Sequence, residues 1–217
     1  MLRHRLVLPL VLFALFATGA PVLAGPPLLC HPFDIGDARS LPWDGREWSQ
    51  GRRDYNVANL VADTEAILTP TTPVIVRMET LRRAALYASL DGRVAAQLLQ
   101  ALNARAAAAE PTSAPASALA LFDAGYLTET YRQISQLGRV DGLGTRSQTI
   151  TAVLGKADGK KFMDRTIALR PDDGAIQFAA ALVAASTDRT AYAQHAAKAR
   201  EGASRDPLLA RNIKQLS

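Results

Sequence analysis

Alanine is the feature that most constrains the fold of this chain, because it occupies 40 of the 217 positions. It is the strongest helix former among the amino acids, and its small side chain lets neighbouring helices pack closely. Long alternations of β-branched residues, which would predict strands, do not occur. The most strand-like run, Val74 to Val76, follows Thr72-Pro73, a pair that suits the start of a helix. The sequence therefore predicts an all-α domain of antiparallel helix pairs, at least half helical and without a sheet of three or more strands.

Proline, glycine and capping residues divide the chain into segments whose apolar residues recur at helical spacing. Residues 25–53 are expected to form an irregular N-terminal strap, followed by a single helical domain over residues 54–217. A linker is expected at 110–116 and a glycine-containing loop at 138–144. The expected helices span residues 55–68, 73–89, 91–109, 117–137, 146–154, 159–169, 173–185, 189–203 and 206–216.

Residues 1–24 have the layout of a secretory signal peptide. The sequence Arg-His-Arg at 3–5 is followed by an apolar run from Leu6 to Phe16, and small residues precede Gly25. We expect cleavage after Ala24 and an exported protein, either periplasmic or secreted. A retained membrane anchor is the alternative interpretation of the same segment, and only then is contact with a membrane expected.

The charge of the chain does not favour a nucleic-acid partner. The formal net charge is +5 at pH 7, and removal of residues 1–24, which hold two arginines and no acid, lowers it to +3. So mild a charge on an exported protein predicts no binding of nucleic acid. Cys30 is the only cysteine, so no disulfide can form within the chain. Lipid attachment to Cys30 is disfavoured because Leu29 stands where that signal requires a small residue.

The run Thr166 to Asp173, with the sequence TIALRPDD, resembles the end of a tetratricopeptide repeat. In that family a small residue and a leucine close the second helix of a unit, and a proline with acidic or amide residues then turns the chain. Proline cannot continue a helix, and aspartate caps the next one. Asp206-Pro207 would close a further unit, so the resemblance covers about residues 155–217. We predict consecutive antiparallel helix pairs over 159–216 with turns at these two prolines; an unrelated helical bundle is the alternative.

Single positions match the family pattern only in part. Ala180, Ala181, Ala193 and Ala197 stand where the family packs helix-contact residues, whereas Gln177 replaces its large aromatic residue and Gly159 its usual alanine. Ala180, Ala181 and Ala193 are expected at helix–helix contacts, because small side chains let helix backbones approach closely. The polar residues between them are expected to face outward, available to a partner: Gln177, Gln194 and Lys198.

The densest group of reactive side chains lies in the strap, where Cys30, His31, Asp34 and Asp37 fall within eight residues. The string CHPFD is similar to one near the mature start of uncharacterised exported bacterial proteins, a resemblance that implies no activity. Cys30 is a candidate reactive thiol, a candidate for pairing with another chain, or a metal ligand beside His31 and an aspartate. The competing interpretation is a strap whose aspartates bond the backbone in turns. Its docking residues would be Leu28, Leu29, Phe33, Trp43 and Trp48.

Elsewhere the sequence offers little chemistry. The run Gly155 to Lys161 has too few residues between its glycines for a phosphate-binding loop, and a lysine replaces the hydroxyl, so a solvated turn is expected. His195 is expected at the surface of an alanine-rich helix. We therefore expect no cofactor and no enzymatic role; the family resemblance implies a protein that binds another protein or a peptide. The alternative function is a thiol- or metal-dependent module centred on Cys30, His31 and Asp34.

Overall fold

Helices supply all the regular structure in the computed structural model, which describes residues 25–44, 47–109, 115–138 and 144–216. Of the described chain, 67% is helical and no part forms a strand, which confirms the predicted all-α class. The predicted signal peptide, and residues 110–114 and 139–143 of the predicted linker and loop, lie outside the described residues. The elements are η1 (Val57–Asn59), α1 (Leu60–Ile67), α2 (Val74–Ala88), α3 (Gly92–Ala109), α4 (Pro115–Gln136), α5 (Gly144–Leu154), α6 (Gly159–Leu169), α7 (Gly174–Ala184), α8 (Arg189–Gly202), α9 (Pro207–Asn212) and η2 (Ile213–Gln215).

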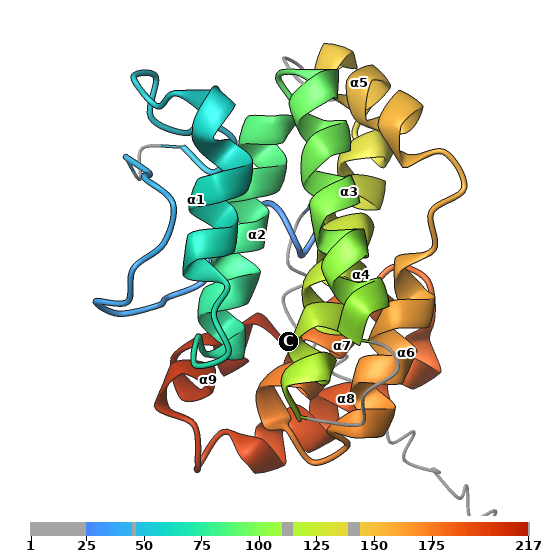
Figure 1. Ribbon diagram of the computed structural model, residues 1–217. Helices are drawn as coiled ribbons and strands as arrows, with labels where there is room; N and C mark the ends of the chain where they lie inside the picture. The colour runs from blue at the N-terminus through green and yellow to red at the C-terminus, as the bar shows by residue number, and fades with distance from the viewer. Residues whose placement is uncertain (1–24, 45–46, 110–114, 139–143, 217) are drawn as a thin grey trace, which may run out of the picture.

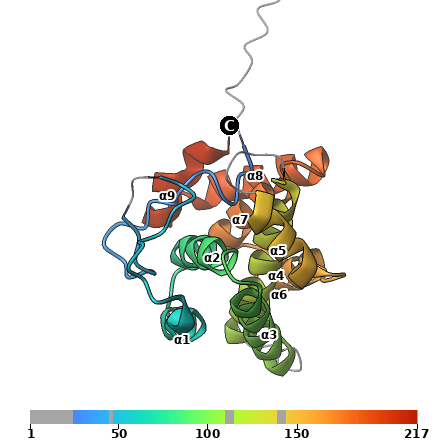
Figure 2. The ribbon, with the colours of Figure 1, turned by 90° about the horizontal axis from the view of Figure 1, so that it is seen from above.

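Three helices that are buried on nearly every side form the centre of the molecule. These are α2, α4 and α7, which are continuously buried over residues 74–82, 121–131 and 175–182. In Figure 2, α2 lies between α1 on one side and α7 and α9 on the other. Helix α4 packs against α2, α3, α5 and α6 (Figure 1). A helix that is covered all round needs apolar or small residues on every face, which α4 and α7 supply.

A buried ion pair joins two of the central helices. Arg77 of α2 donates to the Asp123 carboxylate of α4 across 2.6 Å, and both side chains are 1% exposed. The same guanidinium also donates to the carbonyls of Thr69 and Thr72, in the turn before α2. Burial raises the pKa of Asp123 to about 6, although the charge of Arg77 acts in the opposite direction. Loss of either partner would leave a buried charge uncompensated, so the pair ties the two helices together.

Two pairs of glycines let helix backbones touch. A Cβ atom on Gly159 of α6 would lie 2.6 Å from the carbonyl oxygen of Gly125 in α4. A Cβ atom on Gly202 of α8 would lie 2.7 Å from the Cα atom of Gly174 in α7. No side chain fits at such distances, so both helix crossings require glycine. Gly159, which replaces the alanine usual in the tetratricopeptide pattern, therefore permits the close contact between α6 and α4.

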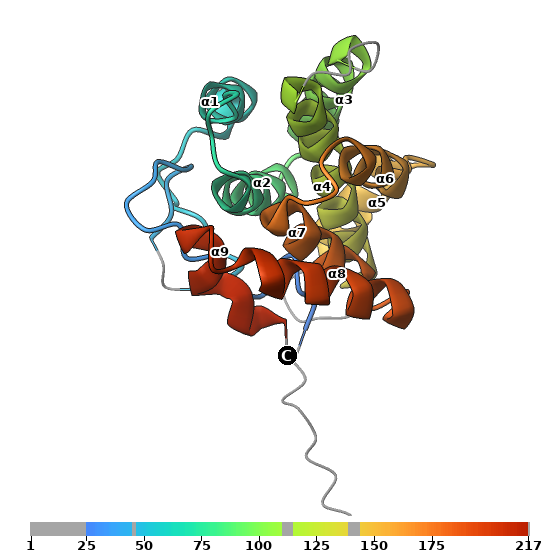
Figure 3. The ribbon, with the colours of Figure 1, turned by 90° about the horizontal axis from the view of Figure 1, so that it is seen from below.

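The C-terminal helices follow the predicted order but not the predicted pairing, since only α7 and α8 form a close consecutive pair and α9 touches α7 more than α8. Pro171 lies in the turn before α7, and Pro207 begins α9, where the Asp206 carboxylate accepts from two backbone N–H groups of the helix. Helices α7 and α8 pack closely on each other and are joined by a short turn, as Figure 3 shows from below. Helix α6, however, packs chiefly against α4 and touches α7 much less. The glycine contact between α6 and α4 accounts for this choice.

The predicted orientations of single residues in α7 and α8 are partly confirmed. Ala180 and Ala181 are buried, while Gln194 and Lys198 are exposed as expected. The prediction for Ala193 was wrong: α8 turns a stripe of other small residues toward its neighbours, and Ala193 is exposed. That stripe consists of Ala196, Ala199 and Gly202.

The prediction that Gln177 faces outward was also wrong, because its side chain is fully buried. Its amide nitrogen donates to the carbonyl of Pro171 across 2.7 Å. Its amide oxygen lies 2.7 Å from Nδ1 of His195. Both ends of the amide are therefore paired, which removes the penalty that burial of this polar group would otherwise carry.

Candidate functional site

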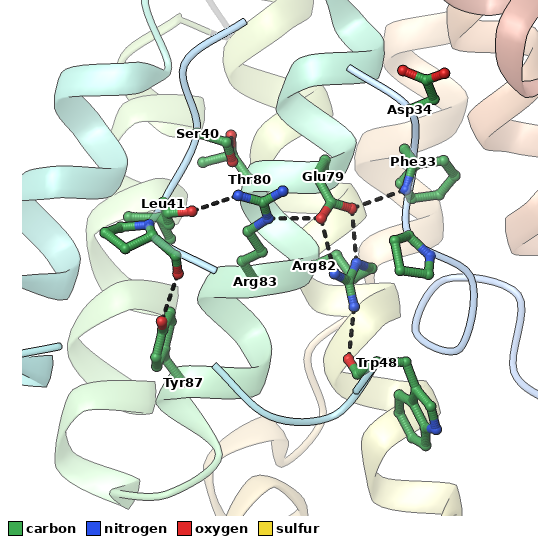
Figure 4. A network of polar contacts seen from close by, with 12 residues as sticks. Phe33, Asp34, Ser40, Leu41, Trp48, Glu79, Thr80, Arg82, Arg83 and Tyr87 are labelled. Atoms are coloured by element: carbon green, nitrogen blue, oxygen red, sulfur yellow. Dashed lines mark hydrogen bonds and ion pairs between the residues drawn. The ribbon is translucent and has the colours of Figure 1, made fainter. Parts of the chain in front are cut away.

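The N-terminal strap lies across α2, and its backbone is held by a buried carboxylate. Glu79 of α2 is fully buried and accepts hydrogen bonds from the Phe33 N–H at 3.0 Å, from Arg82 at 2.8 Å and from Arg83 at 2.7 Å (Figure 4). Burial acts to raise the pKa of Glu79, but its bonds to Arg82 and the charges of both arginines outweigh burial and lower it. The carboxylate is therefore charged at neutral pH and fixes the strap at Phe33.

The two arginines extend this network to carbonyl groups further along the strap. Arg82 donates to the carbonyls of Leu29 at 3.2 Å and Trp48 at 2.9 Å, and Arg83 donates to that of Leu41 at 2.6 Å. The Tyr87 hydroxyl donates to the carbonyl of Pro42, and the hydroxyls of Ser40 and Thr80 bond each other. Figure 4 shows the bonds from Arg83 to Leu41 and from Arg82 to Trp48. An extended segment without its own regular structure thus finds partners for its backbone groups.

Apolar contacts dock the strap as predicted. Leu28 and Leu29 are fully buried, and the ring of Phe33 meets that of Phe178 in α7 edge-on, with centroids 6.0 Å apart. Trp43 and Trp48 are partly buried against the same core. The Cζ atom of Arg82 lies 4.9 Å from the centroid of the Trp43 ring, so the guanidinium makes a cation–π contact with this ring.

The four candidate residues of the strap do not converge on one site. The Asp34 carboxylate accepts from the Gly36 N–H at 2.9 Å and lies 3.4 Å from Arg211, and these groups lower its pKa, the Gly36 bond most. Asp34 thus bonds the backbone in a turn, as predicted. Asp37 is exposed. Figure 4 places Asp34 beyond Phe33, away from Glu79.

Cys30 and His31 are partly buried and lack the surroundings of a reactive pair. Burial raises the pKa of the Cys30 thiol, although the charge of Arg82 opposes this, so the thiol form prevails at neutral pH. A reactive cysteine needs the opposite shift, because the thiolate is the nucleophile. Nε2 of His31 is buried without a hydrogen-bond partner. Across the described ranges, no three histidine, cysteine, aspartate or glutamate side chains gather closely enough to hold a metal ion.

A pocket of about 490 Å³ opens between α4, α6, α7 and α8, and we call it the α6–α8 pocket. Its volume lies within the range of sites that bind small ligands or peptide side chains. Small residues of α7 lie beneath the gap between α6 and α8, which is why the gap is hollow. Its apolar lining consists of Ala157, Met163, Ile167, Ala180, Val183, Ala184 and Ala191.

Charged residues surround this apolar floor, and several of them pair with each other. Glu129 and Arg132 of α4 bond at 3.1 Å, and Arg132 also donates to the carbonyl of Ala157. Lys160 and Asp164 of α6 pair at 2.8 Å. The turn at 155–158, expected only as a solvated connection, forms part of the pocket wall.

His195 also lines the pocket and is less exposed than predicted. Because the amide nitrogen of Gln177 donates to Pro171, its oxygen faces Nδ1 of His195, and Nδ1 carries the hydrogen of this bond. Burial lowers the pKa of His195, and the charge of Lys198 acts in the same direction. The imidazole is therefore neutral at pH 7.

Sequence reasoning missed this pocket because its lining, between residues 129 and 195, comes from four helices whose packing on one another leaves no periodic pattern in the sequence. Comparison with family models, with curated proteins and with solved structures found no match for the chain. In the part of the chain that the structure describes, no helix has both the length and the apolar character needed to cross a membrane.

Proposed function

We propose that this protein is a non-enzymatic binding protein that takes a segment of another protein or a peptide into the α6–α8 pocket. The observation that carries the proposal is the floor of small and apolar side chains, open between α6 and α8 and surrounded by charged residues. Such a combination suits recognition, because the floor supplies affinity and the polar groups fix orientation.

The engagement of the polar groups supports binding rather than catalysis. His195 is bonded to Gln177, Lys160 to Asp164, and Arg132 to Glu129. A general base or nucleophile would need its reactive atom directed at a substrate, whereas the bonded atoms of these pairs are directed at one another, within α6, within α4 and between α7 and α8. The tetratricopeptide-like resemblance of residues 155–217 implies the same class of function, since such arrays bind peptides between their helices.

Export belongs to the proposal as well, and a measurement on the N-terminus tests it. The basic start, apolar run and small-residue site over residues 1–24 are the features that favour it. N-terminal sequencing of protein recovered from outside the cytoplasm should begin at Gly25. Full-length material that sediments with membranes would instead favour a retained anchor.

A matched pair of alanine substitutions on α8 tests the binding role. Ala191 lines the pocket, whereas Ala197 is exposed and lies on the same helix outside it. Peptides are first selected on the wild-type protein from a random library displayed on phage. Their affinity is then measured for Ala191→Trp, which fills the pocket, and for Ala197→Trp, which does not.

We expect the selected peptides to lose at least about tenfold in affinity on Ala191→Trp, a change of about 1.4 kcal/mol, and to bind Ala197→Trp as they bind the wild type. Far-ultraviolet circular dichroism of both variants verifies that they fold alike. Equal binding to the two variants, or a library that gives no binder, would reject the pocket as the binding site.

A further inference from the structure

We infer that the segment bound in the α6–α8 pocket presents a lysine or arginine side chain to Glu129. This inference rests on the proposed function and adds the chemistry of the partner. Glu129 is a buried residue of the pocket wall, 8% exposed. Its Oε2 atom is held by Arg132, but its Oε1 atom is buried without a hydrogen-bond donor.

A buried carboxylate oxygen without a donor is unusual in a folded protein. Most buried polar atoms find a partner, and one that does not carries an energetic penalty. A cationic side chain from a bound segment would supply the missing donor and remove that penalty. The orphaned atom is therefore a reason to expect a ligand with a donor group at this position.

The glycine at the start of α6 makes room for this carboxylate. A Cβ atom at Gly159 would lie 2.6 Å from Oε1 of Glu129, so alanine at 159 would displace it. The neighbouring N-cap residue, Asp158, makes no side-chain hydrogen bond to the helix. The positive end of the α6 helix dipole favours a negative charge nearby, but it gives Oε1 no hydrogen-bond donor. The donor still has to come from outside.

The charges of the lining also favour a cationic ligand. Four acids line the pocket against three lysine or arginine residues, although the chain as a whole carries a net charge of +5. Two of those three bases, Arg132 and Lys160, are paired with Glu129 and Asp164, which leaves Asp158 and Asp188 against Lys156. An acidic segment would meet this surplus of carboxylates and would leave Oε1 without a donor.

The apolar floor selects among cationic groups. Lysine and arginine carry their charge at the end of an aliphatic stem, which can lie along an apolar surface while the charged end meets a carboxylate. Met163 and Ile167 of α6 supply such a surface within the same pocket as Glu129. A simple inorganic cation would use the carboxylate but not the floor.

The phage-displayed random peptide library is the probe for this inference. Peptides selected on the wild-type protein should be enriched in lysine or arginine at one position. Replacement of that residue by glutamine in a synthetic peptide should weaken binding to the unaltered wild-type protein at least about tenfold. Because the protein itself is unchanged, this arm does not depend on whether a variant folds.

The reciprocal arm uses Glu129→Gln, with Glu201→Gln as the matched control at an exposed position of α8. Glu129→Gln should bind the selected basic peptide at least about tenfold more weakly than the wild type does, and should bind the peptide with glutamine at that position almost as the wild type does. The control Glu201→Gln should bind both peptides as the wild type does. Selected peptides without a basic residue, or equal binding of both peptides, would overturn this inference. If Ala191→Trp still abolishes binding in that case, the pocket remains the binding site and only the chemistry of the partner is wrong.

Discussion

Replacement of Glu79 by glutamine should detach the N-terminal strap from α2. The carboxylate is fully buried and joins three donors: the Phe33 N–H and the guanidinium groups of Arg82 and Arg83. Glutamine has nearly the same shape, but it replaces one of the oxygens with an NH₂ group. That group would face a guanidinium donor, and the charges of buried Arg82 and partly buried Arg83 would lose their counter-charge.

The size of the effect follows from the burial of this network. Removal of one partner from a buried ion pair costs about 3–5 kcal/mol, because the other charge remains uncompensated. The Arg82 side chain is 0% exposed and Arg83 is 18% exposed, so solvent can relieve only the second. Since the free energy of unfolding of a domain is about 5–15 kcal/mol, the substitution should remove a large part of it.

The two tryptophans of the chain give a direct assay, because Trp43 and Trp48 both lie in the strap. Their fluorescence in urea reports docking of the strap, while far-ultraviolet circular dichroism reports the helices. The wild-type protein should show one transition by both signals. In Glu79→Gln, the fluorescence change should occur at lower urea than the loss of helix.

Glu201→Gln, at an exposed position, is the control and should change the free energy of unfolding by no more than about 0.5 kcal/mol. If Glu79→Gln unfolds at the same urea concentration as the wild type by both signals, the carboxylate does not hold the strap. The reasoning from the buried network would then be refuted.

Three further predictions concern packing and pH. Ala181→Leu should lower the free energy of unfolding, measured in urea, by about 1–3 kcal/mol, because Ala181 is fully buried. Ala193→Leu, at an exposed position, should change it by less than about 0.5 kcal/mol. Equal stability of the two variants would contradict the packing of Ala181. Gly202→Ala should lower the melting temperature, since its Cβ atom would lie 2.7 Å from the Cα of Gly174. Arg82 and Arg83 outweigh burial and lower the pKa of Glu79 in the folded protein. The charged carboxylate therefore stabilises the fold fully above the pKa that Glu79 has in the unfolded chain, and this stabilisation is lost as the pH falls through its lower pKa in the folded protein. The stability difference between the wild type and Glu79→Gln should therefore narrow in acid, and a constant difference would argue against a lowered pKa.

Local signals in the sequence predicted the helices well. Asp173 and Asp206 cap the helices that follow them, as the proline-aspartate turns indicated, and α7 and α8 begin and end within one residue of the expected positions. The apolar residues of the strap also predicted that it docks on the helices, because large apolar side chains are usually buried against a core.

Contacts between residues distant in the sequence could not be predicted. The Glu79 network was missed because charged residues in a helix normally indicate an exposed face, and the strap whose backbone groups bond these side chains lies about 40 residues earlier. The burial of Gln177 depends on His195, and the α6–α8 pocket depends on the crossing of α4 and α6 at two glycines. None of these pairings leaves a periodic pattern.

Mapping of a selected peptide on the protein by NMR tests the central claim most directly. With ¹⁵N-labelled protein and a peptide selected on the wild type, the largest amide shifts should fall around the α6–α8 pocket, at Lys160, Met163, Val183 and His195. Amides of the strap around Cys30 and Asp34 should change little. Shifts that concentrate on the strap and leave the pocket unchanged would contradict the account.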